Sequence, residues 1–590
     1  MKKQLITLLL ASSMLLGGCV NIHPNDVESE TEEMTSQEIV EQPAPELPLR
    51  ESVGLEFWSA ENNTCYVTGI GTCKDSTLVI PATSPKGETV VGVSEWAFSN
   101  CSMLKIVYLP DTVKTIELYA FRNCRNLYSV HLNSVETIGE FAFFKCNFSS
   151  VSIPKSVKSI GRAAFTGSSR LSSVHVHPDN LYYRSTRCGL VEIWTRTLIL
   201  GCADDGSVSL DCREGVNFIG DYAFYGNEAL RWFNANGALG KVGAYAFGGC
   251  KNVTKIGIDY GVKQIGTGAF SECSSLQYMK LYDSVTEIGT GILEGCTSLK
   301  EVYIGTGITE IPARTFARCY NLTKIEPHIE QGYLKNVKSI GEYAFEDCQS
   351  LTEIPLPSGL ETIHDGAFAN CFNLKHLEIP EQVTIGTYCL FINCLDLESV
   401  NLPANTERIE TSCFANCGSL KSIVIPSSVT HIGERAFSWC YSLETLTVEE
   451  GNQTFIAKDG CVIERSTKTL VATTTHAEIP SNGSVEVIAD GVLTGIRKSD
   501  IIIPEGVKVI GAQNFCGNGY LKSVSIPHSV EEIQDYVFVH CWSLETIYYN
   551  GTVAEWKQLM QNYSWMTWRE LVIKCTDGEI YVVCSDPAKG

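Results

Sequence analysis

Residues 420–440 read LKSIVIPSSVTHIGERAFSWC, and the spacing of the apolar side chains within this stretch decides the fold. Ile423 and Ile425 occupy alternate positions, which is the period of a β-strand with one buried face. Pro426 ends that strand, because proline has no N–H to donate to a strand ladder. The stretch therefore begins with a short half-buried strand.

The second half of the same stretch predicts a bend followed by a compact turn. Val429 and Ile432 begin another short extended segment, and Gly433 permits the chain to bend after it. Phe437 and Cys440 are spaced to point the same way from about one helical or 3₁₀ turn. Each such unit delivers one aromatic ring and one small thiol to the interior.

This unit recurs along most of the 590-residue chain, with successive copies mostly 22 or 23 residues apart. The aromatic position, or a leucine in its place, is found at Phe98, Phe121, Phe143, Phe165, Phe224, Phe247, Phe270, Leu293, Phe316, Phe345, Phe368, Phe391, Phe414, Phe437, Leu493, Phe515 and Phe538. One unit cannot close a core alone, but units stacked at ~4.8 Å form continuous apolar ladders. The sequence predicts a solenoid of leucine-rich-repeat-like coils, β-dominated, with seventeen such coils.

The repeat is interrupted twice, by similar segments near residues 176–215 and 449–485. In both, a glycine-led apolar run is followed by a second β-rich run. These runs are 189–193 and 197–199 in the first segment, and 460–464 and 469–471 in the second. We interpret each as a β-hairpin within the solenoid.

The repeat from about Leu78 to Tyr549 closely resembles the BspA-like leucine-rich repeat family of bacterial surface proteins. The resemblance implies a secreted or surface-attached protein, and several members of that family act as adhesins for host matrix proteins or other cells. It says little about the ligand, because the motif residues are the buried ones.

The N-terminus predicts export and lipid anchoring. Lys2 and Lys3 precede an apolar run that ends in Leu-Gly-Gly-Cys19, which resembles a bacterial lipobox. Residues 1–18 are then the signal peptide, and Cys19 is the acylated first residue on the extracellular face of a bacterial membrane. An ordinary signal peptide with a chance cysteine is the alternative.

The remaining boundaries follow from composition. Residues 19–50 are acidic and proline-rich, which predicts a disordered tether. Residues 51–97 form the expected N-terminal cap, 98–550 the solenoid and 551–590 a C-terminal cap of a helix and a hairpin. The formal net charge of −22 argues against nucleic acid and anionic lipid as partners.

Thirteen of the 25 cysteines fall at one repeat position: Cys101, Cys124, Cys146, Cys250, Cys273, Cys296, Cys319, Cys348, Cys371, Cys394, Cys417, Cys440 and Cys541. Other coils place Ser168, Asn227, Ile496 and Asn518 there. We therefore predict free, buried thiols at a site that needs a modest side chain, although neighbouring coils could allow a few bridges.

Two further cysteine pairs flank expected hairpins and are candidate disulfides, Cys65 with Cys73 and Cys575 with Cys584. The segment 65–73 is interpreted as two short strands about a glycine turn.

No catalytic or cofactor motif stands out, and we expect no cofactor, no metal site and no enzymatic activity. His175 and His177 have metal-like spacing but lack a third ligand in sequence reach. An enzyme would require acids near Glu192 and Glu464 to converge. Four tryptophans between Trp542 and Trp568 suggest either an aromatic plug over the last coil or a sugar-stacking platform.

The outward positions of the repeat strand mix aromatic and charged residues in the middle coils, a composition that protein interfaces favour. The candidate ligand-binding residues are Trp232, Tyr278, Lys280, Tyr303 and His376. Random variation of exposed positions is the alternative. The expected partner is an extracellular protein, on the host matrix or another cell, and a glycan or mucin is the second candidate.

Overall fold

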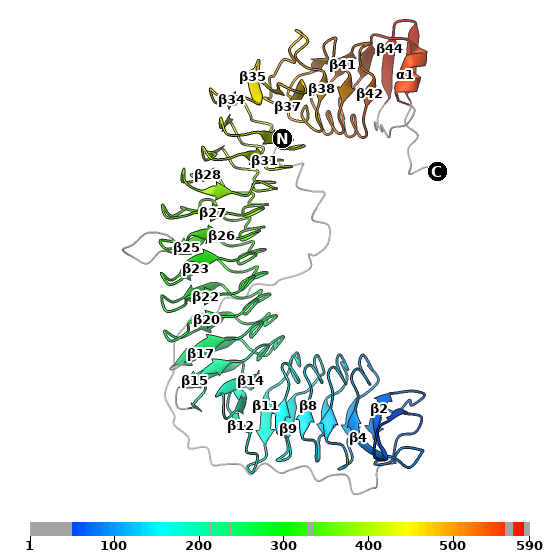
Figure 1. The fold of residues 1–590 in the computed structure, drawn as a ribbon, viewed down its shortest axis with the longest axis vertical. Coiled ribbons are helices and arrows are strands. Elements are labelled where there is room, and N and C mark those ends of the chain that lie inside the picture. The colour runs from blue at the N-terminus through cyan, green and yellow to red at the C-terminus, as the bar shows by residue number, and fades with distance from the viewer. Residues whose placement is uncertain (1–49, 212–213, 237–238, 327–333, 561–569, 583–590) are drawn as a thin grey trace, which may run out of the picture. The chain divides into compact units, whose positions relative to one another are not determined.

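The chain is described here by a computed structural model covering residues 50–211, 214–236, 239–326, 334–560 and 570–582. Residues 51–590 form one unit, a β-solenoid of about 21 turns whose coils stack on one another (Figure 1). The number exceeds the seventeen aromatic positions because some turns lack the Ala-Phe pair. The strands at Thr77–Val79 and Ser207–Asp211, for example, join the ladders without one.

Each regular coil contributes a strand to a first parallel column, which we call the long-strand column. Its members are β3 (Thr77–Val79), β5 (Ile106–Tyr108), β7 (Ser129–His131), β9 (Ser150–Ile153), β11 (Ser173–Val176), β15 (Ser207–Asp211), β17 (Trp232–Asn236), β19 (Lys255–Gly257), β21 (Tyr278–Leu281), β23 (Glu301–Ile304), β25 (Lys324–Glu326), β28 (His376–Leu377), β30 (Ser399–Val400), β32 (Ser422–Ile425), β34 (Thr445–Val448), β39 (Asp500–Ile502), β41 (Ser523–Ile526) and β43 (Thr546–Tyr549). In β32, Ile423 and Ile425 are buried and Ser422 and Val424 are exposed, as the alternation predicts.

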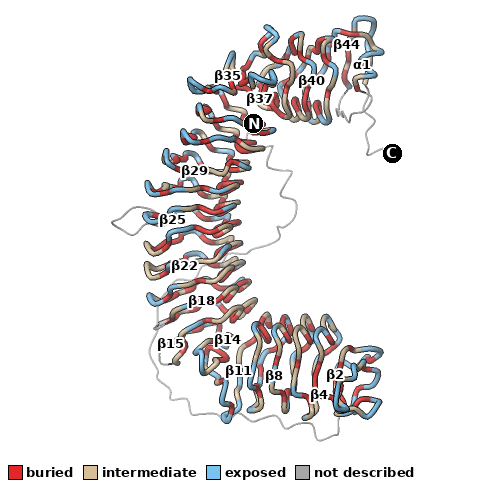
Figure 2. The backbone as a smooth tube through the Cα atoms, viewed as in Figure 1, coloured by how far each residue is buried: buried red, intermediate tan, exposed pale blue. Residues whose placement is uncertain are grey.

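The second extended segment of each coil forms a short-strand column. Its members are β4 (Thr89–Val93), β6 (Thr115–Ile116), β8 (Thr137–Ile138), β10 (Ser159–Ile160), β16 (Phe218–Ile219), β18 (Lys241–Val242), β20 (Gln264–Ile265), β22 (Glu287–Ile288), β24 (Glu310–Ile311), β26 (Ser339–Ile340), β27 (Thr362–Ile363), β29 (Thr384–Ile385), β31 (Arg408–Ile409), β33 (His431–Ile432), β38 (Val487–Ile488), β40 (Val509–Ile510) and β42 (Glu532–Ile533). Figure 2 shows the buried residues on the inner side of the coils.

The segment that carries the phenylalanine is a series of turns rather than a turn of helix. Arg435 and Trp439 have left-handed φ values of 57° and 58°, which no helix accommodates. The N–H of Cys440 donates to the carbonyl of Phe437, three residues back. In addition, the N–H of Phe414 donates to the carbonyl of Ala436 in the next coil at 2.8 Å. The turns therefore form a third inter-coil hydrogen-bond ladder, which the sequence did not predict.

Gly433 is required for space rather than for its backbone freedom. Its φ is not in the left-handed region, but a Cβ at this position would lie 2.5 Å from the backbone nitrogen of Thr411 in the preceding coil. Glycine was expected here because it permits a bend. It is required instead because two backbones approach each other closely at this position.

Replacing Gly433 by alanine is expected to lower the free energy of unfolding by about 1 to 3 kcal/mol, because the backbone that it meets cannot move aside cheaply. Gly418→Ala is the matched control, since its Cβ would meet nothing closer than 3.7 Å. That variant should be neutral or stabilising by about 0.5 kcal/mol. Urea unfolding of both variants tests this, and equal midpoints would refute it.

The repeat cysteines have a bonding role as well as a packing role. The Cys440 thiol donates to the carbonyl of Phe414 at 3.2 Å, and the Cys417 thiol to that of Phe391 at 3.1 Å. Ser168 and Asn227 at this position also donate to a backbone carbonyl of a preceding coil. A side-chain donor is therefore common at this site, although the buried Ile496 shows that the site also accepts an apolar side chain. All thirteen cysteines are free, as predicted, and all but the half-buried Cys101 are buried.

The two interruptions are confirmed as antiparallel elements, each with three strands instead of two. They consist of β12 (Tyr183–Thr186), β13 (Gly189–Glu192) and β14 (Thr197–Gly201), and of β35 (Phe455–Lys458), β36 (Cys461–Glu464) and β37 (Thr469–Thr473). Alternate residues of β13 face different cores: Leu190 packs into the cluster that precedes the hairpin and Val191 into the one that follows. Each three-stranded element thus separates two hydrophobic clusters.

At the N-terminal cap the prediction for residues 65–73 is wrong. The hairpin there is formed by β1 (Glu56–Ser59) and β2 (Thr64–Gly69), because Cys65 pairs with Ser59 and the chain after Gly69 turns away. Cys65 and Cys73 do not flank a hairpin, and both thiols are free in the structure. A disulfide between Cys65 and Cys73 is therefore no longer supported, because its only support was that they flank a hairpin.

At the C-terminal cap, α1 (Val553–Leu559) begins at the predicted capping box, in which Thr552 and Glu555 bond each other's backbone. β44 (Leu571–Cys575) and β45 (Gly578–Val582) form the expected antiparallel pair. Trp556 is buried against Tyr549, with ring centroids 5.3 Å apart. For this tryptophan the plug interpretation holds. Cys584, Trp565 and Trp568 lie outside the described residues, so the pairing of Cys575 with Cys584 stays a prediction.

Candidate functional site

The outward side chains of the long-strand column are aligned by the strand register. Trp232 lies opposite Lys255, Tyr278 opposite Glu301, and His376 opposite Ser399. Parallel pairing fixes this alignment, since each side chain stands beside its counterpart one coil away. Three of the five predicted binding residues, Trp232, Tyr278 and His376, therefore belong to one column.

Lys280 and Tyr303 are also opposite each other, one pair of positions further along the strands. The ammonium of Lys280 lies 4.6 Å from the ring centroid of Tyr282 and 4.9 Å from that of Tyr303. The ring of Tyr260 contacts that of Tyr282 in a tilted arrangement, with 4.5 Å between centroids. We call Tyr260, Tyr278, Lys280, Tyr282 and Tyr303 the tyrosine–lysine cluster.

Tyr303 departs from the prediction, because it is only 9% exposed. Lys280 covers the ring of Tyr303, and the Tyr303 hydroxyl donates a hydrogen bond to the Asp283 carboxylate at 3.4 Å. Burial and the nearby Asp283 carboxylate raise the pKa of Tyr303 to about 12. The exposed members are instead Tyr278, at 42%, and Tyr260, at 65%.

Sequence reasoning missed Tyr260 and Tyr282 because they follow the strands, in the turns that leave β19 and β21. A signal was present nonetheless: the two tyrosines are 22 residues apart, one repeat, so they occupy equivalent positions in adjacent coils.

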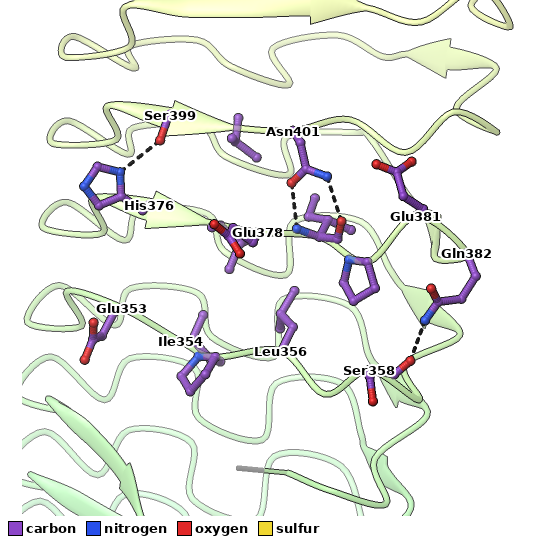
Figure 3. A pocket seen from close by; sticks show the side chains of 15 residues that line it. Glu353, Ile354, Leu356, Ser358, His376, Glu378, Glu381, Gln382, Ser399 and Asn401 are labelled. Atoms are coloured by element: carbon purple, nitrogen blue, oxygen red, sulfur yellow. Dashed lines mark hydrogen bonds between the residues drawn. The ribbon is translucent and has the colours of Figure 1, made fainter. Parts of the chain in front are cut away.

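A groove of about 1020 Å³ opens on the same face, over the coils that contain β28 and β30 (Figure 3). Its apolar walls include Ile354, Leu356 and Ile379, and its rim carries carboxylates. The predicted residue His376 lines it, and the His376 ring nitrogen Nδ1 is hydrogen-bonded to the Ser399 hydroxyl at 2.9 Å.

The groove exists because the strand ladder is interrupted there. Between the coil of residues 351–360 and that of 374–382, pairing is reduced to one bridge, from Glu353 to His376. The next pair of coils keeps two pairs, between β28 and β30, and coils further along keep longer ladders, such as the four pairs that join β32 to β34. Pro355 follows the bridge and has no N–H to extend a ladder.

The carboxylates required by an enzymatic alternative do not come together. Glu192 accepts a hydrogen bond from Thr195, and Glu464 accepts one from Thr467 at 2.7 Å, each within its own hairpin turn. The first hairpin lies between the first and second hydrophobic clusters along the chain, and the second hairpin lies between the second and third.

His175 and His177 lie at the outward side of the β11 segment, and His177 bonds locally to Asp179. Within the described ranges, no three histidine, cysteine, aspartate or glutamate side chains gather as metal ligands would. The same part of the chain contains no helix long and apolar enough to cross a bilayer.

Comparison with known proteins bears on the fold. The family described as BspA type leucine-rich repeat region matches residues 91–188, 217–334, 328–444 and 471–564, which together are more than half of the chain. No curated protein matches the sequence.

Several solved structures are similar to this chain. A leucine-rich repeat protein from Bacteroides ovatus is 22% identical over 69% of this chain and all of its own, with a TM-score of 0.40. One from Eubacterium ventriosum is 21% identical over 58% of this chain and 93% of its own, with a TM-score of 0.42. The pneumococcal vaccine antigen PcpA is 18% identical over 53% of this chain and 92% of its own, with a TM-score of 0.37.

Proposed function

Because the chain belongs to the BspA-type leucine-rich repeat family, we propose that it is a bacterial surface lipoprotein that binds an extracellular protein through its long-strand face. Export and anchoring are supported by the basic, apolar N-terminus that ends at Cys19. A glutamate-rich segment follows Cys19 and would hold the solenoid away from the membrane.

The tyrosine–lysine cluster is the observation that carries the proposal. Tyrosine is among the residues most enriched at protein-binding hot spots, since it buries a large area and keeps a polar tip. Tyr260 and Tyr278 are exposed, and Lys280 is positioned by two ring faces instead of being free to sample rotamers. A positioned cation beside exposed rings loses little conformational entropy when a partner binds.

The same geometry favours a protein over a glycan. Sugars stack on open aromatic faces, but the ring of Tyr282 has Lys280 at 4.6 Å and Tyr260 at 4.5 Å. The ring edges and hydroxyls that remain suit the mixed polar and apolar contacts of a protein interface.

The test is capture of the full chain on arrays of host matrix proteins and glycans. The double variant Tyr260→Ser with Tyr278→Ser should bind the captured protein at least about tenfold more weakly, because hot-spot tyrosines contribute more than 1 kcal/mol each. Its melting temperature should stay nearly unchanged, since both side chains are exposed.

Tyr128→Ser is the matched control, since Tyr128 is 48% exposed and lies outside the cluster. Tyr303 is not replaced, because its burial would confound binding with stability. Capture of glycans alone, or of proteins by the double variant at full strength, would contradict the proposal.

A further inference from the structure

The groove on the long-strand face is closed at both ends and open in its middle. At one end Glu353 and His376 form the last bridge between the two coils. At the other end the Gln382 side chain donates to the carbonyls of Ser358, at 2.7 Å, and Leu360, at 3.1 Å. Between these ties the coils stand apart, as Figure 3 shows.

On one side of the coil of residues 374–382, the ladder to the next coil is completed by a side-chain amide that mimics a peptide bond. The Ile379 N–H donates to Asn401 Oδ1 at 2.8 Å, and Asn401 Nδ2 donates to the Ile379 carbonyl at 2.7 Å. These two bonds replace the direct backbone pairing that the regular coils make in this place. The coils of β28 and β30 therefore accept a side-chain amide in place of backbone pairing.

On the other side, no group within the described ranges fills the equivalent gap. The carbonyl of Ile354 and the N–H of Glu378 are at positions that are hydrogen-bonded in the ladder of a regular coil. Here neither group is hydrogen-bonded to a described residue. Ile354 is buried, and buried backbone groups are ordinarily hydrogen-bonded. A peptide amide from outside the chain would satisfy them.

The negative charge around the groove favours a positively charged ligand. Glu353, Glu378 and Glu381 line it, and no lysine or arginine does. The apolar walls and the open backbone groups suit an extended strand, which pairs through its main chain and projects alternate side chains.

We propose that this groove binds an extended, lysine- or arginine-rich peptide segment of the partner by β-pairing in the Ile354–Glu378 gap. The proposal rests on the proposed function, because it names the segment of the partner protein that the long-strand face engages.

Fluorescence polarisation of the full chain with labelled octapeptides tests it directly. An alternating Lys-Val peptide should bind. The alternating Lys-Pro peptide should bind at least about tenfold more weakly, because it has the same charge but its prolines lack the N–H groups for pairing. A Glu-Val peptide should not bind.

Substitutions separate the groove from the overall acidity of the chain. Glu353→Gln with Glu378→Gln should weaken Lys-Val binding at least about fivefold, whereas Glu407→Gln with Glu444→Gln, which removes the same charge outside the groove, should not. Equal binding of the Lys-Val and Lys-Pro peptides, or equal weakening by the two double variants, would overturn the inference.

The two proposals fail in different ways. If the array captures a protein through Tyr260 and Tyr278 but the Lys-Val peptide does not bind, the groove inference falls and the proposed function stands. If no protein is captured, the proposed function falls, and the peptide assay still reports on the groove.

Discussion

Raising the pH from about 9 to about 10.5 is expected to unfold the solenoid, because its interior holds thiols that cannot ionise while it is folded. All thirteen repeat cysteines have a pKa raised by burial, including the half-buried Cys101. The pKa reaches about 12 for Cys124, Cys250, Cys296, Cys394, Cys440 and Cys541, and lies well above the ordinary 9.0 for Cys146, Cys273, Cys319, Cys348, Cys371 and Cys417.

The sign follows from proton binding. A raised pKa means that the folded state holds the proton more tightly, so this contribution to stability is complete below pH 9 and is lost as the pH rises toward 12. At about pH 10 each thiol whose pKa is about 12 costs on the order of 1 kcal/mol of stability, so the six such thiols together remove several kcal/mol, a large part of the stability of an ordinary domain.

Circular dichroism measured against pH, with thiolate absorbance followed in parallel, checks this expectation. The two transitions should coincide, because the thiols ionise only when the coils open. Replacing several repeat cysteines by serine should move the transition to higher pH, since Ser168 already occupies this position as a donor and does not titrate. Thiolate absorbance that rises while the native spectrum persists would show that the thiols are accessible in the folded state.

Replacing Phe368 by alanine is expected to lower the free energy of unfolding by about 3 to 5 kcal/mol. Its ring is fully buried and stacks between Phe345 and Phe391, with centroids at 5.7 and 5.9 Å. The substitution leaves a cavity and also removes two ring contacts, one to each adjacent coil. Because each coil contacts only its neighbours, the loss of stability should appear as local opening of the coils around position 368.

Phe368→Leu is the control for that experiment. Leu293 is fully buried at the equivalent position between Phe270 and Phe316, so a coil can close around leucine. This variant should cost about 1.5 kcal/mol or less. Urea unfolding, together with hydrogen exchange of the neighbouring coils, measures both. A leucine variant as unstable as the alanine variant would show that stacking, not volume, holds the ladder.

Much of this protein could be predicted from periodicity. The repeat of apolar residues predicted the strands, the buried Phe and Cys positions, both antiparallel insertions and the capping box of α1. This was possible because each of these features depends on residues close together in one coil, copied many times.

Other features could not be predicted, because they depend on distances between coils. The burial of Tyr303 under Lys280 and the contact of Tyr260 with Tyr282 belong to this class. The wrong strand partner expected for Cys65 is a different kind of error, because β1 and β2 form a local hairpin. A single coil's sequence does not say which side chain of the next coil will cover it.

The sequence alone determined that this chain is a stack of similar coils, since a solenoid's core consists of the same position repeated. Only the tertiary structure decided why Gly433 must be glycine, what the cysteine thiols bond, and where the ladder opens at Glu353. The physical reason is that each of these is a contact across the gap between neighbouring coils, which the sequence of one coil does not specify.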